Sequence, residues 1–172
     1  TITGSVNNDT ISGGAGADFL TGGNGVDTLS GGAGNDTFLY VAASNSTLVN
    51  LDVISDFTAN TVSLAAPLNT AALAATRNGD VLSFTALAAV ATQAGVGPIR
   101  VSVQTNSSDA QTFLQNISAD ATADEFAAAL DSSTGRLFVD LDANGTVDSV
   151  VQLTGVTTIT AAAFVVVSFV VV

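Results

Sequence analysis

The sequence contains no cysteine, histidine, lysine, methionine or tryptophan. Without cysteine it can form neither a disulfide framework nor a thiolate zinc site. Without histidine, cysteine and lysine it lacks the commonest general bases, thiol nucleophiles and Schiff-base formers, so any catalysis would rest on Asp, Glu, Ser, Thr or Tyr40. We therefore expect no enzymatic activity in these 172 residues, which leaves open a catalytic domain upstream in a longer protein.

Positive charge is also scarce, because three arginines face 15 acidic residues and the formal net charge is −12. This balance excludes the basic patch that nucleic-acid binding requires, and it excludes anionic lipid as a partner for the same reason. Such an acidic surplus marks either a solubilising surface or a set of hard-cation sites. The positions of the Asp residues decide between the two.

Long hydrophobic runs are missing too, since no stretch of about 18 apolar residues is present that could span a membrane. The sequence has no initiator Met and no basic stretch that would mark an amino-terminal signal peptide. Thr1–Thr3 match the last three places of the repeat described next, so we expect the sequence to be the carboxy-terminal part of a longer protein. A hydrophobic content of 47% still suffices for a continuous core.

Residues 4–39 are four copies of a nine-residue repeat in constant register. Glycine recurs at the first, second and fourth places, Asp at the sixth and a large apolar residue at the eighth. The eighth places hold Ile11, Leu20, Leu29 and Phe38. The first copy departs from the pattern at Ser5 and Asn7, which favours a weak site or a cap there. A flexible acidic linker would not keep Asp and an apolar residue in phase over four copies.

The spacing of the repeat predicts a solenoid that binds cations. Glycine permits positive φ and close backbone approach, so a six-residue turn can aim its carbonyls at a cation while Asp supplies charge. One repeat cannot bury its own apolar residue, so the copies must stack, with two turns and two short strands in each coil. Asp9 and Asp27 should then bracket one ion, and Asp18 and Asp36 another. The candidate ligand residues are Asp9, Gly13, Gly16, Asp18, Gly22, Gly25, Asp27, Gly31, Gly34 and Asp36.

This pattern, G-G-x-G-x-D-x-U-x with U large and apolar, resembles the nonapeptide of the RTX family. The resemblance implies a parallel β-roll that binds several Ca2+ ions. It also implies a secreted protein, extracellular or at the cell surface, with a type I secretion machinery as its partner. Affinities of about 10⁻⁴–10⁻³ M, typical of extracellular modules, would leave the chain loose in the cytosol and folded outside the cell.

The segment after the repeats predicts how the array ends. Residues 40–48 fit a degenerate fifth copy in which Asn45 takes the place of the Asp. The D-x-I-x-D-F stretch at residues 52–57 resembles the join after the RTX array in serralysin-type metalloproteases. That resemblance implies that the stretch closes the roll and that Asp52 and Asp56 help to hold the last calcium ion. Solvated turn carboxylates are the alternative for both residues.

From residue 58 onward the β-branched and aromatic content predicts strands over Val62–Leu64, Val81–Phe84, Ile99–Thr105, Thr112–Ile117, Leu137–Leu141 and Val147–Leu153. Short helices are predicted over Thr70–Ala75, Thr85–Thr92 and Thr122–Leu130. The predicted fold class is therefore mainly all-β. A parallel β-roll over residues 1–57 continues into a β-sandwich-like extension over residues 58–172, which would also carry the secretion signal.

Two carboxy-terminal segments allow more than one interpretation. Residues 140–148 reproduce the first nine places of a D-x-D-x-N-G-x-x-D calcium loop but lack the carboxylate expected at place twelve, so a plain Asn-Gly hairpin fits as well. The candidate ligands there are Asp140, Asp142, Asn144 and Asp148. Residues 134–155 also resemble the end of the serralysin-type carboxy-terminal domain. Phe164–Val172 fits a closing strand, an exposed secretion signal or an edge that pairs with another chain.

Two classes of parent protein fit these observations. The Ala/Thr/Val/Ser-rich composition is similar to surface-layer, matrix and adhesin-like proteins that self-assemble outside the cell with calcium. Alternatively, the chain is the calcium-folding and secretion domain of an extracellular hydrolase, such as a serralysin-type peptidase or a lipase. An upstream H-E-x-x-H helix would identify a peptidase, whereas further Thr/Ala-rich β repeats would favour a lattice or an adhesin.

Overall fold

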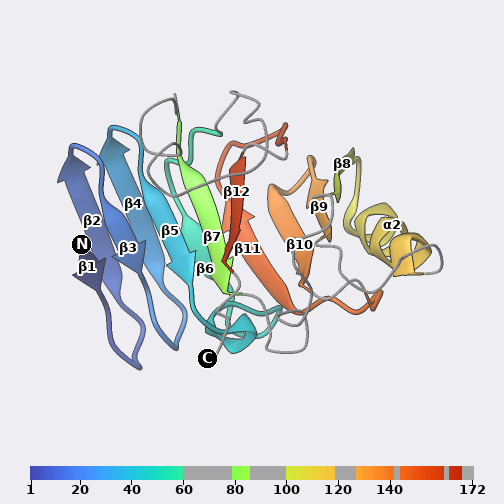
Figure 1. Cartoon of the computed structure of the whole chain (residues 1–172), viewed down its shortest axis with the longest axis horizontal. Helices are drawn as coiled ribbons and strands as arrows, with labels where there is room; N and C mark the ends of the chain where they lie inside the picture. Colours follow the sequence, from blue (N-terminus) through green and yellow to red (C-terminus); the bar gives the residue numbers. More distant parts are fainter. Residues whose placement is uncertain (60–78, 86–99, 119–126, 142–143, 161–162, 168–172) are drawn as a thin grey trace.

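The computed structural model describes residues 1–59, 79–85, 100–118, 127–141, 144–160 and 163–167. Its amino-terminal part winds back and forth between two parallel sheets (Figure 1). One sheet begins with β1 (Ile2–Thr3), β3 (Phe19–Thr21) and β5 (Thr37–Tyr40), and the other begins with β2 (Thr10–Ala15) and β4 (Thr28–Ala33). Leu20 pairs with Phe38, and Ile11 with Leu29. Neighbouring strands are thus two repeats apart, which confirms the predicted solenoid.

Both sheets continue past the repeats. β7 (Val81–Thr85) and β12 (Phe164–Val167) extend the first sheet to five strands. The second sheet reaches seven strands by adding β6 (Asp52–Ile54), β11 (Ser149–Leu153), β10 (Arg136–Asp140), β9 (Ala127–Asp131) and β8 (Arg100–Gln104). β6 and β11 are parallel, whereas β10 runs antiparallel to both of its neighbours. The predicted mainly-β fold is confirmed.

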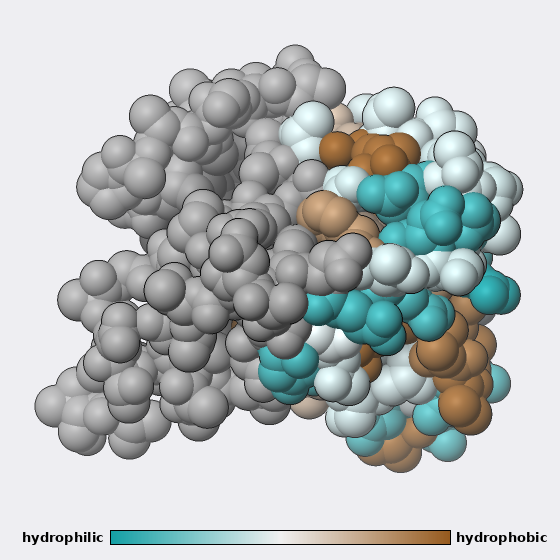
Figure 2. Space-filling model, turned by 90° about the vertical axis from the view of Figure 1, so that its right-hand side faces the viewer, coloured by the Kyte–Doolittle hydropathy of each residue, from teal (hydrophilic) through white to brown (hydrophobic). Residues whose placement is uncertain are grey.

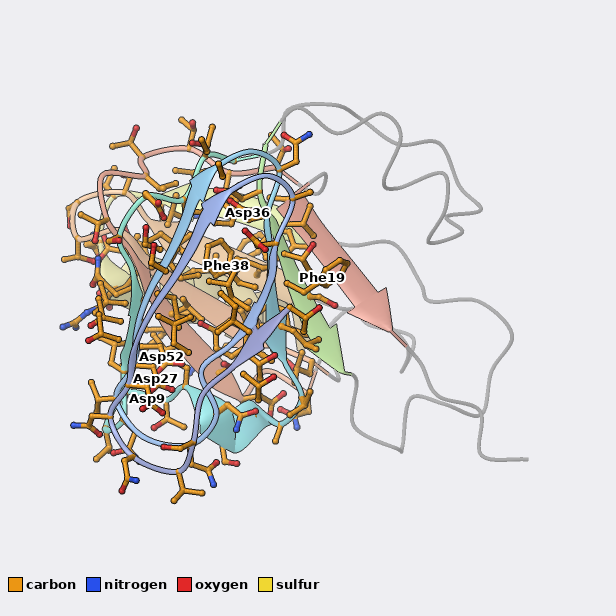
Figure 3. All side chains as sticks on the ribbon, turned by 90° about the vertical axis from the view of Figure 1, so that its left-hand side faces the viewer. Asp9, Phe19, Asp27, Asp36, Phe38 and Asp52 are labelled. Carbon is orange, nitrogen blue, oxygen red and sulfur yellow. The ribbon has the colours of Figure 1, made fainter. Side chains whose placement is uncertain are left out.

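The main core lies between the two sheets. The eighth-place residues Ile11, Leu20, Leu29 and Phe38 are buried there as predicted, and Phe38 lies inside the coil in Figure 3. Ile54, Leu82 and Phe84 belong to the same core cluster. Because each coil can bury its apolar residue only against the next coil, the roll depends on this stacking for its stability. The extension shares one apolar core with the roll.

A single α-helix occurs in the described part of the chain, α2 (Ser107–Ser118), which covers the outer face of the seven-stranded sheet beside β8 and β9 (Figure 1). The Asn106 side chain accepts a hydrogen bond from the amide of Asp109 at 2.9 Å and so caps the helix start. Figure 2 views this end of the molecule, where hydrophilic and hydrophobic residues intermix over the described surface.

This helix shows that the strand predicted over Thr112–Ile117 is wrong. Ala110 and Leu114 lie one helical turn apart and are both buried. They form a second core cluster with Ala127, Ala129, Phe138 and Val150 of the sheet. The apolar residues therefore follow the helical period of the segment, and its β-branched content does not decide its structure.

The helix predicted over Thr122–Leu130 is wrong in its described part, because Ala127–Asp131 form strand β9. Alternate residues of β9 face different neighbours. Ala127 and Ala129 pack in the cluster beneath α2, and Ala128 and Leu130 pack in the core between the sheets. A strand buried on both faces by tertiary packing overrides the helix propensity of alanine.

Of the remaining predicted elements, the strands around residues 81–84, 99–105, 137–141 and 147–153 are confirmed as β7, β8, β10 and β11. The predictions over Val62–Leu64, Thr70–Ala75 and 86–92 lie outside the described residues, and Thr85 is the last residue of β7. Phe164–Val167 form a closing strand parallel to β7, one of the three interpretations of the tail. No helix in the described ranges combines the length and apolarity needed to cross a membrane.

Candidate metal centre

The sixth-place Asp residues line up along the two edges of the roll. On one edge, which we call the first row, the Asp9 amide donates to Oδ1 of Asp27 at 2.8 Å, and the Asp27 amide donates to Oδ1 of Asp52 at 2.9 Å. Figure 3, viewed along the roll, shows these three residues from successive coils on the same edge. The prediction that Asp9 and Asp27 lie next to each other is therefore confirmed.

The opposite edge repeats this arrangement in what we call the second row. The Asp18 amide donates to Oδ1 of Asp36 at 2.8 Å, and the Asp36 amide donates to Oδ1 of Asp80 at 3.0 Å. Each row is therefore built from two repeat residues and one Asp from beyond the repeats. In every link a backbone amide holds one carboxylate oxygen, and in Asp27, Asp36 and Asp52 the other oxygen has no hydrogen-bond partner among the described residues.

Asp80 is a member of this site that the sequence reasoning missed. A signal was present, because Asp80 and Leu82 reproduce the spacing between the Asp and the large apolar residue of a repeat, with a glycine just before. Leu82 pairs with Phe38, as an eighth-place residue of the next coil should. The 44-residue separation between Asp36 and Asp80 hid this continuation of the repeat.

The fifth copy predicted over residues 40–48 does not form. Ala43–Asn45 are a 3₁₀ helix, and Asn45 accepts from the Ala42 amide at 2.9 Å and donates to the Asn24 side chain at 3.1 Å. The turn between β5 and β6 is longer than a repeat turn, so the place predicted for Asn45 is taken by Asp52.

The repeat glycines have two separate roles. A Cβ at Gly22 or Gly31 would lie closer than 3.0 Å to Oδ2 of the Asp in the same repeat, so the first-place glycine leaves room for the carboxylate. Gly13 has the same relation to Asp18. The fourth-place residues Gly16, Gly25 and Gly34 instead have φ of 115°, 120° and 144°, a backbone conformation that side chains disfavour.

Three carboxylate oxygens in the rows are buried without a hydrogen-bond partner, namely Oδ2 of Asp27, Asp36 and Asp52. All three residues have 0% exposure. An uncompensated buried charge is costly, whereas Ca2+ prefers oxygen ligands of this kind, so these residues fit a calcium ion. Within the described ranges no three acidic, His or Cys side chains converge. The other ligands would therefore be backbone carbonyls, which the glycine turns can present.

The first row is closed by hydroxyl groups at both ends. Oδ2 of Asp9 accepts from the Ser5 amide at 2.6 Å and from Ser5 Oγ at 2.9 Å. At the other end the Asp52 amide donates to Ser46 Oγ at 2.9 Å, in the position that a further Asp would take. The interpretation of the first copy as a cap agrees with the Ser5 contacts. Only Asp27 and Asp52 in this row keep an unpartnered oxygen.

The second row ends in hydrogen bonds to the chain itself. Oδ2 of Asp80 accepts from the Thr58 amide at 2.8 Å. Asp56 accepts from Ser30 Oγ at 2.7 Å and from the Gly31 and Gly32 amides at 3.0 and 2.8 Å. Burial would raise the pKa of Asp56, but these hydrogen bonds outweigh it and lower that pKa. Asp56 thus stabilises the turn of the fourth copy through these hydrogen bonds. Its role as a calcium ligand stays a prediction.

The electrostatics of the rows disfavour negative charge without a cation. Burial, together with the nearby Asp27 carboxylate, raises the pKa of Asp52 to about 7, against the lowering effect of the Asp27 amide. Burial likewise raises the pKa of Asp80, with smaller contributions from Asp36 and Asp56. The pKa of Tyr40 is raised by burial first and then by the charges of Asp52 and Asp27. A divalent cation would reverse this balance by favouring the ionised carboxylates.

The loop at residues 140–148 joins β10 to β11. β10 and β11 pair as an antiparallel hairpin, with Leu137 opposite Val151. Asp140 accepts from the amides of Asn144 and Gly145 at 3.3 and 2.7 Å, and Asp148 accepts from the Leu141 amide at 2.8 Å. Asp142 lies outside the described residues. The hairpin is confirmed, and calcium binding at this loop stays a prediction.

A parallel roll of two-repeat coils with a row of carboxylates along each edge defines the amino-terminal part as a cation-binding β-roll. Residues 3–38 match the family model of the RTX calcium-binding nonapeptide repeat in four copies. These residues are an RTX calcium-binding region, as the sequence pattern predicted. No curated protein matches the chain. The family match ends at residue 38, so the likeness of residues 52–57 and 134–155 to serralysin-type proteases remains a prediction.

Proposed function

We propose that the chain is the calcium-dependent folding module of a secreted protein, exported by a type I secretion machinery, and that this protein assembles into a structural or adhesive layer outside the cell. The observation that carries the proposal is the set of buried, unpartnered carboxylate oxygens in Asp27, Asp36 and Asp52. Calcium, when bound, supplies the positive charge that these oxygens lack.

The rows couple ion binding to formation of the core. The amides of Asp9 and Asp27 hold the next carboxylate of the first row by one oxygen and so set the spacing between coils. The same spacing brings Leu29 and Phe38 into the core between the sheets. Since the carboxylates repel one another without a cation, the coils and the core should form together when calcium binds.

This coupling supports export before folding. At low cytosolic calcium the acidic rows oppose the compact state, so the chain stays unfolded and can pass through a secretion channel. Outside the cell, calcium near the weak affinities of extracellular modules, about 10⁻⁴–10⁻³ M, would fold the roll. Folding on the outer side alone would make the movement directional.

Exposed apolar side chains on one edge of the roll support the assembling role. The turns on the edge of the first row carry Val6, Val26, Val41, Leu48 and Val49, which are between 38% and 88% exposed. Exposed apolar groups gathered on one side favour association with another surface. The alternative role, as the secretion domain of an extracellular hydrolase, gives these side chains no function.

Calcium removal tests the proposal. EGTA should remove the β signal in far-ultraviolet circular dichroism and expose the amides of residues 4–57 to hydrogen exchange, and added Ca2+ but not Mg2+ should restore both. An unchanged spectrum after chelation would refute calcium-dependent folding. Light scattering then separates the two parents, because an assembling protein should form ordered particles in calcium whereas a hydrolase domain should stay monomeric.

A further inference from the structure

We infer that the buried hydroxyl of Tyr40 lines the calcium position at the carboxy-terminal end of the first row, beside Asp27 and Asp52. The inference rests on the proposed calcium role of the rows. It adds a neutral oxygen from outside the repeats, at one end of one row only.

The register of the coils places Tyr40 at this position. Leu20 pairs with Phe38, so Gly22 and Tyr40, two residues further along each strand, occupy the same place in successive coils. Gly22 lies against the carboxylate of Asp27, which ends the same turn. Tyr40 therefore stands in the corresponding place for Asp52, which ends the next turn on that edge.

The Tyr40 side chain is directed into the coil. Its ring stacks on Phe84 with a centroid distance of 5.3 Å and an interplanar angle of 17°, and the residue is only 3% exposed. This packing fixes the ring, so the hydroxyl has little freedom to reach solvent. The rings of Tyr40 and Phe84 thus form an aromatic surface inside this end of the coil, with the Tyr40 hydroxyl buried beside it.

The Tyr40 hydroxyl, like two carboxylate oxygens of the first row, is buried without a hydrogen-bond partner in the described part of the chain. Tyr40 Oη, Asp27 Oδ2 and Asp52 Oδ2 are all buried, and none has a hydrogen-bond partner among the described residues. A buried tyrosine hydroxyl normally finds a partner. The register of the coils places all three groups at the same end of the first row. A hard divalent cation among them would satisfy the three oxygens together.

Among the residues that the structure describes, the second row has no such group at its end. Leu29 pairs with Ile54, so Asp56 occupies the place in its coil that Gly31 occupies in the coil before. In the first row, Tyr40 stands in the equivalent place. Asp56 is held by the turn amides, and Oδ2 of Asp80 is held by Thr58. The two rows therefore differ at their carboxy-terminal ends, and the tyrosine site belongs to the first row alone.

Terbium luminescence tests this placement, because Tyr40 is the only tyrosine in a chain without tryptophan. Tb3+ substitutes for Ca2+, and its emission is sensitised by a nearby excited tyrosine. We expect strong emission on excitation in the tyrosine band, suppressed by excess Ca2+. Asp52→Asn should abolish most of it, whereas Asp36→Asn, an equally buried residue on the opposite edge, should preserve it. Absence of emission from protein that binds Tb3+ by calorimetry would overturn the inference, as would emission that survives Asp52→Asn.

The variant Tyr40→Phe tests the hydroxyl without disturbing the ring. It should retain the stacking on Phe84 and the circular dichroism at saturating calcium, while the affinity of one calcium site falls about tenfold, as for loss of a group that orients metal ligands. Unchanged calorimetric affinities for every site would refute a role for the hydroxyl. A wild-type protein that binds no Ca2+ at all would instead refute the proposed function itself, and the inference with it.

Discussion

Stacking of the coils can be measured with a matched pair of glycines. Gly14 and Gly32 occupy the same place in adjacent coils, with φ of 97° and 92°, so alanine meets nearly equal backbone strain at each. A Cβ on Gly14 meets no described atom within 4 Å, whereas a Cβ on Gly32 would lie closer than 3.0 Å to the Gly14 carbonyl oxygen. Only the second substitution must push two coils apart.

The expected costs follow from these two situations. Gly14→Ala should cost about 1–2 kcal/mol, the penalty for a side chain in the left-handed region. Gly32→Ala should cost about 2 kcal/mol more, because overpacking against a backbone atom adds to the same strain. The difference corresponds to roughly 30-fold in the unfolding equilibrium.

Urea unfolding at saturating calcium, followed by circular dichroism, measures both variants under conditions where the roll is folded. Calorimetric calcium titration of each variant should show weaker binding for Gly32→Ala, because its coils no longer hold the carboxylates at their spacing. Equal losses of stability in the two variants would mean that the coils do not stack as described.

Three further predictions have clear expected outcomes. Asp27→Ala should weaken calcium binding at least about tenfold by calorimetry, while Asp109→Ala on the exposed start of α2 should leave it unchanged; equal effects would contradict the assignment of the rows. Because the Asp52 pKa rises from 3.8 to about 7 on folding, the folded form holds this proton more tightly than the unfolded form. In calcium-free buffer the β signal should therefore decrease as the pH rises from about 4 to about 7, and Asp52→Asn should flatten that dependence; an identical pH profile in the variant would rule out this carboxyl as the cause. Phe38→Ala should cost about 3–5 kcal/mol in urea unfolding, whereas Phe19→Ala, at 49% exposure, should cost less than about 1 kcal/mol; similar losses would contradict the assigned inner face of the strands.

Calcium chemistry at the site was predictable from the repeats, whereas the full membership of each row was not. Asp27 and Asp36 repeat a local pattern, so their partners two repeats away follow from the period. Asp52 was found because it belongs to a recognisable closing stretch, yet its row position was assigned to Asn45. Asp80 follows Asp36 by 44 residues, and this separation hides the short Asp-x-Leu pattern that Asp80 shares with the repeats.

The sequence by itself determined the coil, its period and its inner face, because a nine-residue repeat imposes the same nearest-neighbour contacts on every copy, and Leu20 and Phe38 have to stack if either is to be buried. Only the tertiary structure decided what closes the array. Ala127–Ala129 became a strand because both faces of the sheet are covered there, and residues 112–117 became a helix because Ala110 and Leu114 cover one of those faces. Such choices depend on contacts between distant segments, and local propensity does not encode them.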